Sequence, residues 1–155
     1  MLPMCQNYMT QKNELYFQFL SLPVNIAFAR STVAAFAVQI EEFTEAEYNE
    51  IRKAVSEAVS NCVQHGYPNS TGMINISVFI ENDLLTIVIE DQGAGIENIE
   101  LAKRTEFTTR PGENLGWGFN FMEACMDEIE IESVVGKGTK LTMKKRPQNK
   151  DARPT

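Results

Sequence analysis

Residues 72–95 have the sequence GMINISVFIENDLLTIVIEDQGAG, and this stretch decides the fold. Apolar and polar residues alternate over residues 72–80, and a second apolar run covers residues 84–90. The segment Glu81-Asn82-Asp83 between them favours a tight turn, so the two runs predict an antiparallel β-hairpin. A glycine loop follows the second strand at residues 91–95.

A long amphipathic helix is predicted directly before the hairpin, from residue 44 to residue 66. Thr44 and Glu47 have the spacing of a capping box, which marks the start of a helix. Gly66, followed by Pro68, marks its end. Apolar residues recur along it at three- and four-residue steps: Tyr48, Ile51, Val55, Val59 and Cys62.

A strand and another helix are predicted upstream of that helix. Residues 15–20, LYFQFL, are rich in aromatic side chains, which favours a strand that stops before Pro23. Asn25 is a suitable N-cap for a helix that runs to about residue 41. The buried stripe of this helix is expected to consist of apolar residues at helical spacing: Ile26, Val33, Phe36, Ala37 and Ile40.

The chain downstream of the hairpin contains further helices, loops and strands. Residues 96–103 predict a short helix, and the polar residues 104–115 predict a loop. Residues 116–127 are apolar and helix-like, whereas residues 128–134 and 139–145 predict the last strands. The predicted order is therefore strand, helix, helix, strand, strand, loop, helix, strand, strand.

This order predicts the α+β class. Because helices and strands are interleaved and the hairpins are antiparallel, we expect a two-layer α/β sandwich with a mixed sheet and helices on one face. A length of 155 residues and a hydrophobic fraction of 43% fit one domain with a real core. We expect that domain to span residues 14–146, between an N-terminal tail at residues 1–13 and a C-terminal tail at residues 147–155.

Charge and composition argue against several functions. The formal net charge is -7, and an acidic surface repels nucleic-acid phosphates and anionic membranes, so neither is an expected partner. No apolar run approaches the ~18 residues that span a bilayer, and the first residues lack the pattern of a signal peptide. Cys5, Cys62 and Cys125 follow no metal-binding spacing, which favours structural thiols in a reducing cytosol. A cytoplasmic location is therefore expected.

Glu57 and Asn61 lie four residues apart and share one face of the predicted helix. The pair is open to two interpretations. It belongs either to a solvated polar face or to a site in which Asn61 supplies an oxygen ligand for Mg²⁺ and Glu57 accepts a proton. The spacing alone does not decide between them.

Glycine-bearing corners are the other candidates for a ligand site. They are Asp91-x-Gly93-x-Gly95 after a strand, Gly116-x-Gly118 at a helix start, and Gly138-Thr139 before the last strand. Glycines at a helix start expose backbone N–H groups, which suits a phosphate, but each pattern alone is equally typical of an ordinary turn or hinge. The sequence has no P-loop motif and none of the H-R-D and D-F-G motifs of the common protein kinases.

Taken in order, these patterns resemble the four boxes of the superfamily of gyrase, heat-shock-chaperone, histidine-kinase and mismatch-repair ATPases. Within that superfamily the chain resembles the bacterial anti-sigma factor serine kinases over about residues 14–145. The supporting stretches are FARSTVA at 28–34, VSEAVSN at 55–61, HGY at 65–67, FTTRP at 107–111 and GFNFME at 118–123. The resemblance implies a histidine-kinase-like ATPase fold.

The resemblance also implies a role for each box. Asp91 is expected to hydrogen-bond the adenine amino group, and Asn61 to bind the Mg²⁺ that bridges the phosphates of ATP or ADP. Glu57 is expected to act as general base toward a serine hydroxyl. The other residues implied to contact the nucleotide belong to the glycine boxes, the last strand and a lid over residues 104–115: Gly93, Gly95, Gly116, Gly118, Thr139, Thr108, Thr109 and Arg110.

One position departs from the family pattern. Relatives often carry an arginine-serine pair directly before the Gly-x-Gly, whereas this chain has Asn114-Leu115 there and a lid that is one residue shorter. Arg110 is then the remaining candidate for a lid arginine that contacts phosphate.

The implied function is that of an anti-sigma factor, which binds and inhibits a sporulation sigma factor and uses Mg-ATP to phosphorylate a serine of its anti-anti-sigma protein. General-stress anti-sigma kinases share the same boxes. A non-catalytic ATP-dependent sequestering module, or an ATPase without a protein acceptor, would share the nucleotide site. The implied assembly is a homodimer. Arg30 matches a residue at the sigma-contacting surface of relatives, and is otherwise an ordinary exposed arginine on a helix.

Overall fold

The structure is a computed structural model that describes residues 12–103 and 115–148. Its elements are β1 (Asn13–Leu20), α1 (Asn25–Ala37), α2 (Glu45–Asn61), the π-helical turn η1 (Cys62–Gly66), β2 (Met73–Glu81), β3 (Leu84–Asp91), α3 (Ile99–Ala102), α4 (Leu115–Cys125), β4 (Glu128–Val134) and β5 (Gly138–Lys145). The predicted order of strands and helices is confirmed. α1 was expected to run to about residue 41 but ends at Ala37. Near this end the side-chain amide of Gln39 donates to the backbone carbonyl of Phe36, one of the last carbonyls of the helix.

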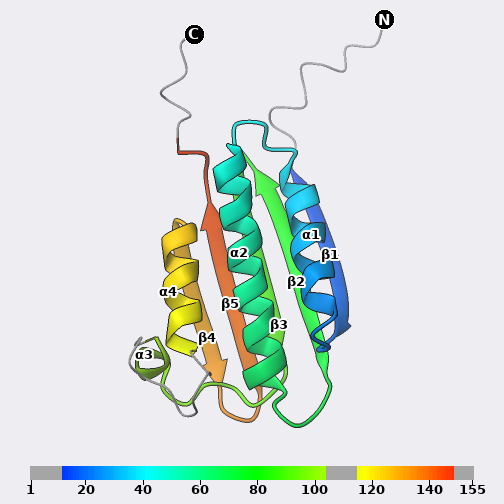
Figure 1. Cartoon of the computed structure of the whole chain (residues 1–155), viewed down its shortest axis with the longest axis vertical. Helices are drawn as coiled ribbons and strands as arrows, with labels where there is room; N and C mark the ends of the chain where they lie inside the picture. Colours follow the sequence, from blue (N-terminus) through cyan, green and yellow to red (C-terminus); the bar gives the residue numbers. More distant parts are fainter. Residues whose placement is uncertain (1–11, 104–114, 149–155) are drawn as a thin grey trace, which may run out of the picture.

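The molecule has two layers. The sheet has the strand order β1-β2-β3-β5-β4, and α1, α2 and α4 lie across one of its faces, as Figure 1 shows. α2 lies over the centre of the sheet, with α1 on one side and α4 on the other, and it contacts both. This arrangement confirms the predicted α+β two-layer sandwich with helices on one face.

The sheet is antiparallel throughout its described strands, which corrects the prediction of a mixed sheet. Every pair of neighbours in the strand order is antiparallel. The chain enters β2 at the sheet end where β1 finished, because α1 and α2 carry it away and back. β4 does run parallel to β3, but β5 lies between these two strands and pairs with both.

The core lies between α2 and the inner face of the sheet. The alternation predicted for β2 is confirmed, because Ile74, Ile76 and Val78 are buried there. They belong to one apolar cluster with Ile51 and Val55 of α2. Burying each such side chain stabilises the fold by about 1.5–3 kcal/mol, so the core fixes α2 relative to the strands on which it lies.

The starts of the two long helices differ from each other. At α2 the predicted capping box is confirmed, since Glu47 N–H donates to Thr44 Oγ1 at 3.1 Å and Thr44 N–H donates to Glu47 Oε1 at 3.0 Å. At α1 the prediction of Asn25 as N-cap is wrong. Val24 is the N-cap residue and makes no side-chain cap. Asn25 instead donates its side-chain amide to the carbonyl of Leu20 at 2.9 Å and so ties the helix to the end of β1.

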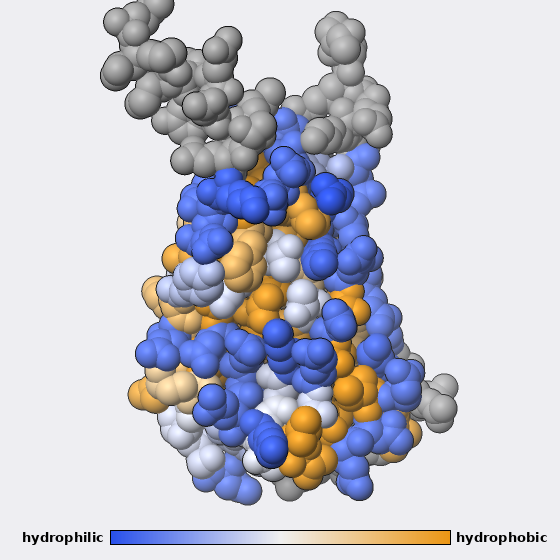
Figure 2. Space-filling view, turned by 180° about the vertical axis from the view of Figure 1, so that it is seen from behind, coloured by the Kyte–Doolittle hydropathy of each residue, from blue (hydrophilic) through white to orange (hydrophobic). Residues whose placement is uncertain are grey.

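The far face of the sheet is not covered by any helix of the described residues. Figure 2 shows this face, with hydrophilic residues over much of it and apolar residues between them. Tyr16 and Phe79 form an edge-to-face pair with ring centroids 5.7 Å apart.

None of the helices in the described part of the chain combines the length and apolarity required to cross a membrane.

Candidate functional site

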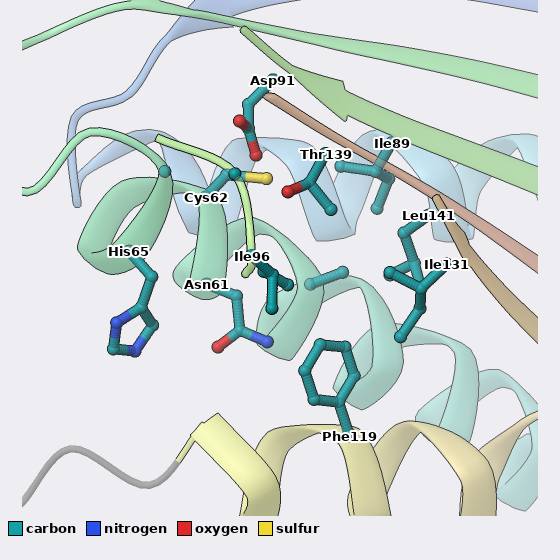
Figure 3. Close-up of a pocket in the computed structure, with 13 residues that line it drawn as sticks. Asn61, Cys62, His65, Ile89, Asp91, Ile96, Phe119, Ile131, Thr139 and Leu141 are labelled. Atoms are coloured by element: carbon teal, nitrogen blue, oxygen red, sulfur yellow. The ribbon is translucent and has the colours of Figure 1, made fainter. Parts of the chain in front are cut away.

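A cavity lies between the helix layer and the ends of β3 and β5, and Figure 3 shows the side chains that line it. The space between these side chains amounts to about 470 Å³, counting the open solvent at its mouth. Its walls are apolar: Ala58, Ile89, Ile96, Phe119, Ile131 and Leu141. Asp91 and Thr139 add polar groups from the strands, and Asn61 adds one from the helix side.

Asp91 stands at one end of this cavity. It is the last residue of β3, and only 6% of its surface is exposed. Its Oδ1 accepts a hydrogen bond from the backbone N–H of Gly93 at 2.9 Å. Thr139 is its neighbour in β5. A carboxylate has about four acceptor positions, so Asp91 retains acceptors for a ligand that presents an N–H donor.

The loop after Asp91 packs against the end of the preceding helix. The N–H of Ala94 donates to the carbonyl of Gly66 at 2.8 Å. A Cβ atom at Gly93 would lie 1.9 Å from that carbonyl oxygen, so only glycine fits this approach. Sequence patterns indicated Gly66 only as a helix stop. The contact between Gly66 and Gly93, which lies 27 positions later, leaves no local pattern in the sequence, although this contact holds one wall of the cavity.

Tyr67 fixes the same loop from the other side. Its hydroxyl accepts the N–H of Gln92 at 2.8 Å and donates to the carbonyl of Met73 at 2.8 Å. Burial raises the pKa of the Tyr67 phenol, and the bond from Gln92 lowers it in part. The phenol therefore stays protonated at neutral pH and keeps its proton for Met73. Sequence reasoning assigned Tyr67 no role.

Ser133 organises the strand side of the cavity and was also missed. Its Oγ accepts the N–H of Ile96 at 2.7 Å, donates to the carbonyl of Gly138 at 3.1 Å and lies 2.8 Å from Thr139 Oγ1. Gly138 and Thr139, predicted from a turn pattern, are thus held beside Asp91 by a serine on β4. The only local signal at Ser133 was one more polar position in an alternating strand.

Glu57 and Asn61 face Gly118 of α4, and of the two only Asn61 lines the cavity. A Cβ atom at Gly118 would lie 3.2 Å from Glu57 Oε2 and 3.3 Å from Asn61 Nδ2. The predicted helix pair and the predicted glycine box are therefore side by side. The Asn61 Nδ2 atom is buried and has no hydrogen-bond partner among the described residues. A buried polar atom without a partner is costly, which indicates that a polar ligand completes this end of the cavity.

A divalent cation would need further oxygen ligands here. Within the described residues, no group of three or more His, Cys, Asp or Glu side chains could hold a metal ion. Mg²⁺ often takes only one or two protein oxygens and completes its shell with water and phosphate oxygens. The Asn61 amide, which can present either its oxygen or its N–H group to the cavity, fits that type of site.

The remaining predicted site residues are divided between the cavity, α4 and the outer surface. Gly95 lines the cavity and Gly116 lies in the first turn of α4. Arg30 is exposed on α1, away from the cavity, and its guanidinium is 3.4 Å from Ser56 Oγ. The predictions for Thr108, Thr109 and Arg110 fall outside the described residues.

Comparison with known proteins identifies the family. Residues 19–145 match the model of the histidine kinase-like ATPase domain. The chain is 48% identical to the anti-sigma F factor of Thermoanaerobacter sp. over 88% of its length and 96% of the relative. It is 46% identical to the anti-sigma F factor of Clostridium acetobutylicum over 87% of its length and 94% of the relative.

Solved structures agree on the fold. The chain is similar to the RsbU and RsbW domains of a Mycobacterium tuberculosis protein, with a TM-score of 0.57, 23% identity, and coverage of 86% of this chain and 32% of that one. It is also similar to the histidine kinase domain of the blue-light activated histidine kinase of Erythrobacter litoralis, with a TM-score of 0.53, 16% identity, and coverage of 84% and 63%. With the domain match and relatives that align over nearly their full length, the chain belongs to the anti-sigma F factor family, built on the histidine kinase-like ATPase domain.

Proposed function

We propose that this protein binds and inhibits the sporulation sigma factor sigma-F, and uses Mg-ATP to phosphorylate a serine of its anti-anti-sigma protein. The observation that carries the proposal is one cavity lined by a buried acceptor, Asp91, and by Asn61, which lies next to Gly118 together with Glu57. Apolar walls between the two ends suit a flat purine base. The names of the 46–48% identical relatives supply the sigma factor as partner.

The two ends suit the two ends of a nucleotide. In this proposal the Asp91 carboxylate accepts from the adenine amino group, and Thr139 closes that side of the base. The phosphates extend toward α4, where the backbone N–H of Gly116 in the first turn has no acceptor within the helix and is free to donate. Gly118 has no side chain and so keeps the space beside Glu57 and Asn61 open. Mg²⁺ bound at Asn61 would neutralise phosphate charge and hold the γ-phosphoryl group in line.

Glu57 supplies the general base in the proposed transfer. The substrate serine oxygen forms a bond to the γ-phosphorus as the bond from phosphorus to the β,γ-bridging oxygen breaks, and ADP leaves. Glu57 takes the proton of the serine hydroxyl. The carboxylate lies on the α4 side of α2 and also lines an outer groove, so it is accessible from the surface by which a protein substrate would approach.

That outer groove is the proposed docking surface for the protein partners. Arg30, Arg52 and Lys53 surround it, together with Glu57 and the exposed ring of Phe121. A cluster of cations on a chain with a net charge of -7 favours an acidic partner surface and steers its approach. The groove therefore fits an acidic patch next to the phosphoacceptor serine, and an acidic patch on the sigma factor.

Arg30→Glu is expected to weaken binding of the sigma factor by about 10-fold or more, because like charges across an interface cost several kcal/mol. Surface plasmon resonance at fixed ionic strength measures the effect. Lys140→Glu is the matched control, since it makes the same charge change at an exposed lysine of β5, away from the groove and from the β1 edge. Equal binding by wild type and Arg30→Glu would contradict the assignment of the groove.

The sheet edge at β1 is the proposed homodimer interface. β1 pairs only with β2 in the described strands, and its other edge offers free backbone groups. Apolar side chains are exposed beside it: Tyr16 at 61% and Phe28 at 54%. A second copy about a two-fold axis would pair with the free edge of β1 and cover the exposed apolar side chains.

Sedimentation equilibrium tests this interface. It should give a dimer for wild type and a monomer for Phe28→Asp, and a wild-type monomer at all concentrations would exclude this interface.

The catalytic proposal is tested by incubating the protein with Mg-ATP and the anti-anti-sigma protein and locating phosphate by mass spectrometry. Phosphate on one serine, dependent on Mg²⁺, is expected. Bound ATP without transfer would contradict the kinase and support a sequestering module. Release of phosphate as fast as any transfer would support an ATPase instead. When sigma-F and a general-stress sigma factor are offered together, the one that the protein retains shows which of the two pathways it serves.

Gly118→Ala is expected to stabilise α4 and yet to reduce phosphotransfer. Alanine is about 1 kcal/mol more favourable than glycine inside a helix, but its methyl group would lie 3.2 Å from Glu57 Oε2 and 3.3 Å from Asn61 Nδ2. Displacing these groups is expected to lower transfer by about 10–100-fold. Thermal unfolding and single-turnover transfer together measure both effects, and wild-type transfer in a folded variant would contradict the proposed site.

A further inference from the structure

Asp91, Thr139 and Ser133 form one row across three neighbouring strands beside the cavity. Asp91 of β3 pairs in register with Thr139 of β5, and Thr139 pairs in register with Ser133 of β4. Side chains at paired positions lie on the same face of a sheet. Figure 3 shows the Asp91 carboxylate and the Thr139 hydroxyl close together at the cavity, which both residues line. Ser133, on the other side of Thr139, supports this row without lining the cavity.

The Ser133 hydroxyl has three partners but only one proton. Its Oγ accepts the backbone N–H of Ile96 at 2.7 Å. It also lies 3.1 Å from the carbonyl oxygen of Gly138 and 2.8 Å from Thr139 Oγ1. A carbonyl can only accept, so the bond to Gly138 uses the Ser133 proton. The contact between the two hydroxyl oxygens then needs the proton of Thr139, so Thr139 donates to Ser133.

This arrangement turns the Thr139 proton away from the cavity. Thr139 Oγ1 then offers a ligand only its lone pairs, beside the Asp91 carboxylate, which also accepts. The amino group of a 6-amino purine has two N–H donors and matches two neighbouring acceptors. A 6-oxo purine would instead place a carbonyl oxygen against both, and polar groups left without a partner in a site cause strong discrimination.

We propose that Ser133 is a positioning residue that sets the base specificity of the nucleotide site. It holds the Thr139 hydroxyl as an acceptor, so that the strand side of the cavity selects a 6-amino purine over a 6-oxo purine. Ser133 does not touch the base in this account, because it acts through Thr139. The inference rests on the proposed nucleotide site and adds to it the residue that determines which purine is bound.

The test compares ATP with ITP, whose base carries a 6-carbonyl in place of the amino group, by calorimetric titration of the full chain in Mg²⁺. Wild type is expected to prefer ATP. Ser133→Ala frees the Thr139 proton to donate into the cavity, so the ratio of ATP affinity to ITP affinity should fall by about 10-fold, the effect of one hydrogen bond lost by ATP and one gained by ITP. Ser133→Thr keeps the hydroxyl and should keep the wild-type ratio.

Ser77→Ala is the matched control for Ser133→Ala. Ser77 is also a half-buried strand serine, but it lies between the buried Ile76 and Val78 of β2 and therefore faces away from the cavity. Its ratio should equal that of wild type.

A double-mutant cycle separates this role from general support of the fold. Thr139→Val keeps the size of the side chain but removes the hydroxyl, so it should lower the ratio by itself. Adding Ser133→Ala to Thr139→Val should change the ratio no further. A further fall as large as that of Ser133→Ala alone would overturn the inference, because Ser133 would then act by a route other than Thr139.

Other outcomes would also contradict the inference. An unchanged ratio in a folded Ser133→Ala would show that Ser133 only supports the strands. If Ser133→Ala does not fold, Ser133→Cys decides, because its sulfur is a weak acceptor and an unchanged ratio would contradict the role. A wild type that binds ATP and ITP equally would refute the specificity but keep the site, whereas a wild type that binds neither would refute the proposed site itself.

Discussion

Glu57→Gln is expected to lower serine phosphotransfer by about 10²–10⁴-fold, the usual contribution of a general base, without changing the affinity for Mg-ATP. The substitution keeps the size of the side chain and its contact with α4 but removes the group that accepts the serine proton. Asn61 and Asp91, which would bind the nucleotide, are untouched. Single-turnover transfer and a separate nucleotide titration measure the two effects independently.

A matched control for this variant is Glu123→Gln. Glu123 is an exposed carboxylate on α4, the helix that faces Glu57, so the control makes the same change of charge and size close to the site. It should transfer phosphate at the wild-type rate. If Glu57→Gln also transfers at the wild-type rate, Glu57 belongs to a solvated polar face and another residue acts as the base.

Asp91→Asn is expected to weaken binding of ATP by about 10–100-fold, since a hydrogen bond to a charged group contributes roughly 1.5–3 kcal/mol. An amide has one oxygen where the carboxylate has two. The Gly93 N–H already donates to one of the two Asp91 carboxylate oxygens. The asparagine would therefore either present its NH₂ group to the adenine amino group or leave a buried donor unpaired.

Displacement of a fluorescent ATP analogue measures this loss, and thermal unfolding checks that the variant folds. Asp127→Asn is the control, because Asp127 accepts from the backbone N–H of Arg146 at 2.7 Å, away from the cavity. Its ATP affinity should match wild type. Full affinity in Asp91→Asn would contradict the adenine assignment, whatever the variant does to transfer.

Local patterns determine how much of this fold can be predicted. The hairpin of β2 and β3 has an alternating pattern and a turn in which Asn82 and Asp83 both adopt positive φ, as such turns require. The capping box of α2 is equally local. The position of β5 between β3 and β4 is not, because it depends on which strands meet after the helices have packed. The error of a mixed sheet follows from that limit.

The site shows the same division. Glu57, Asn61 and Asp91 could be predicted as site residues because their spacing and order along the sequence match the boxes of the ATPase superfamily. Tyr67 and Ser133 could not, because each acquires its importance from contacts between segments far apart in the chain. Local patterns identify residues that repeat a motif, whereas supporting contacts emerge only once the elements have packed together.

A calorimetric titration of the purified chain with ATP and with ADP, in the presence of Mg²⁺, decides whether the cavity binds a nucleotide. The account predicts saturable binding of one nucleotide per chain, in the cavity between α2, α4 and the ends of β3 and β5. No heat of binding with either nucleotide up to about 1 mM, where even a free energy near −4 kcal/mol is detectable, would contradict it.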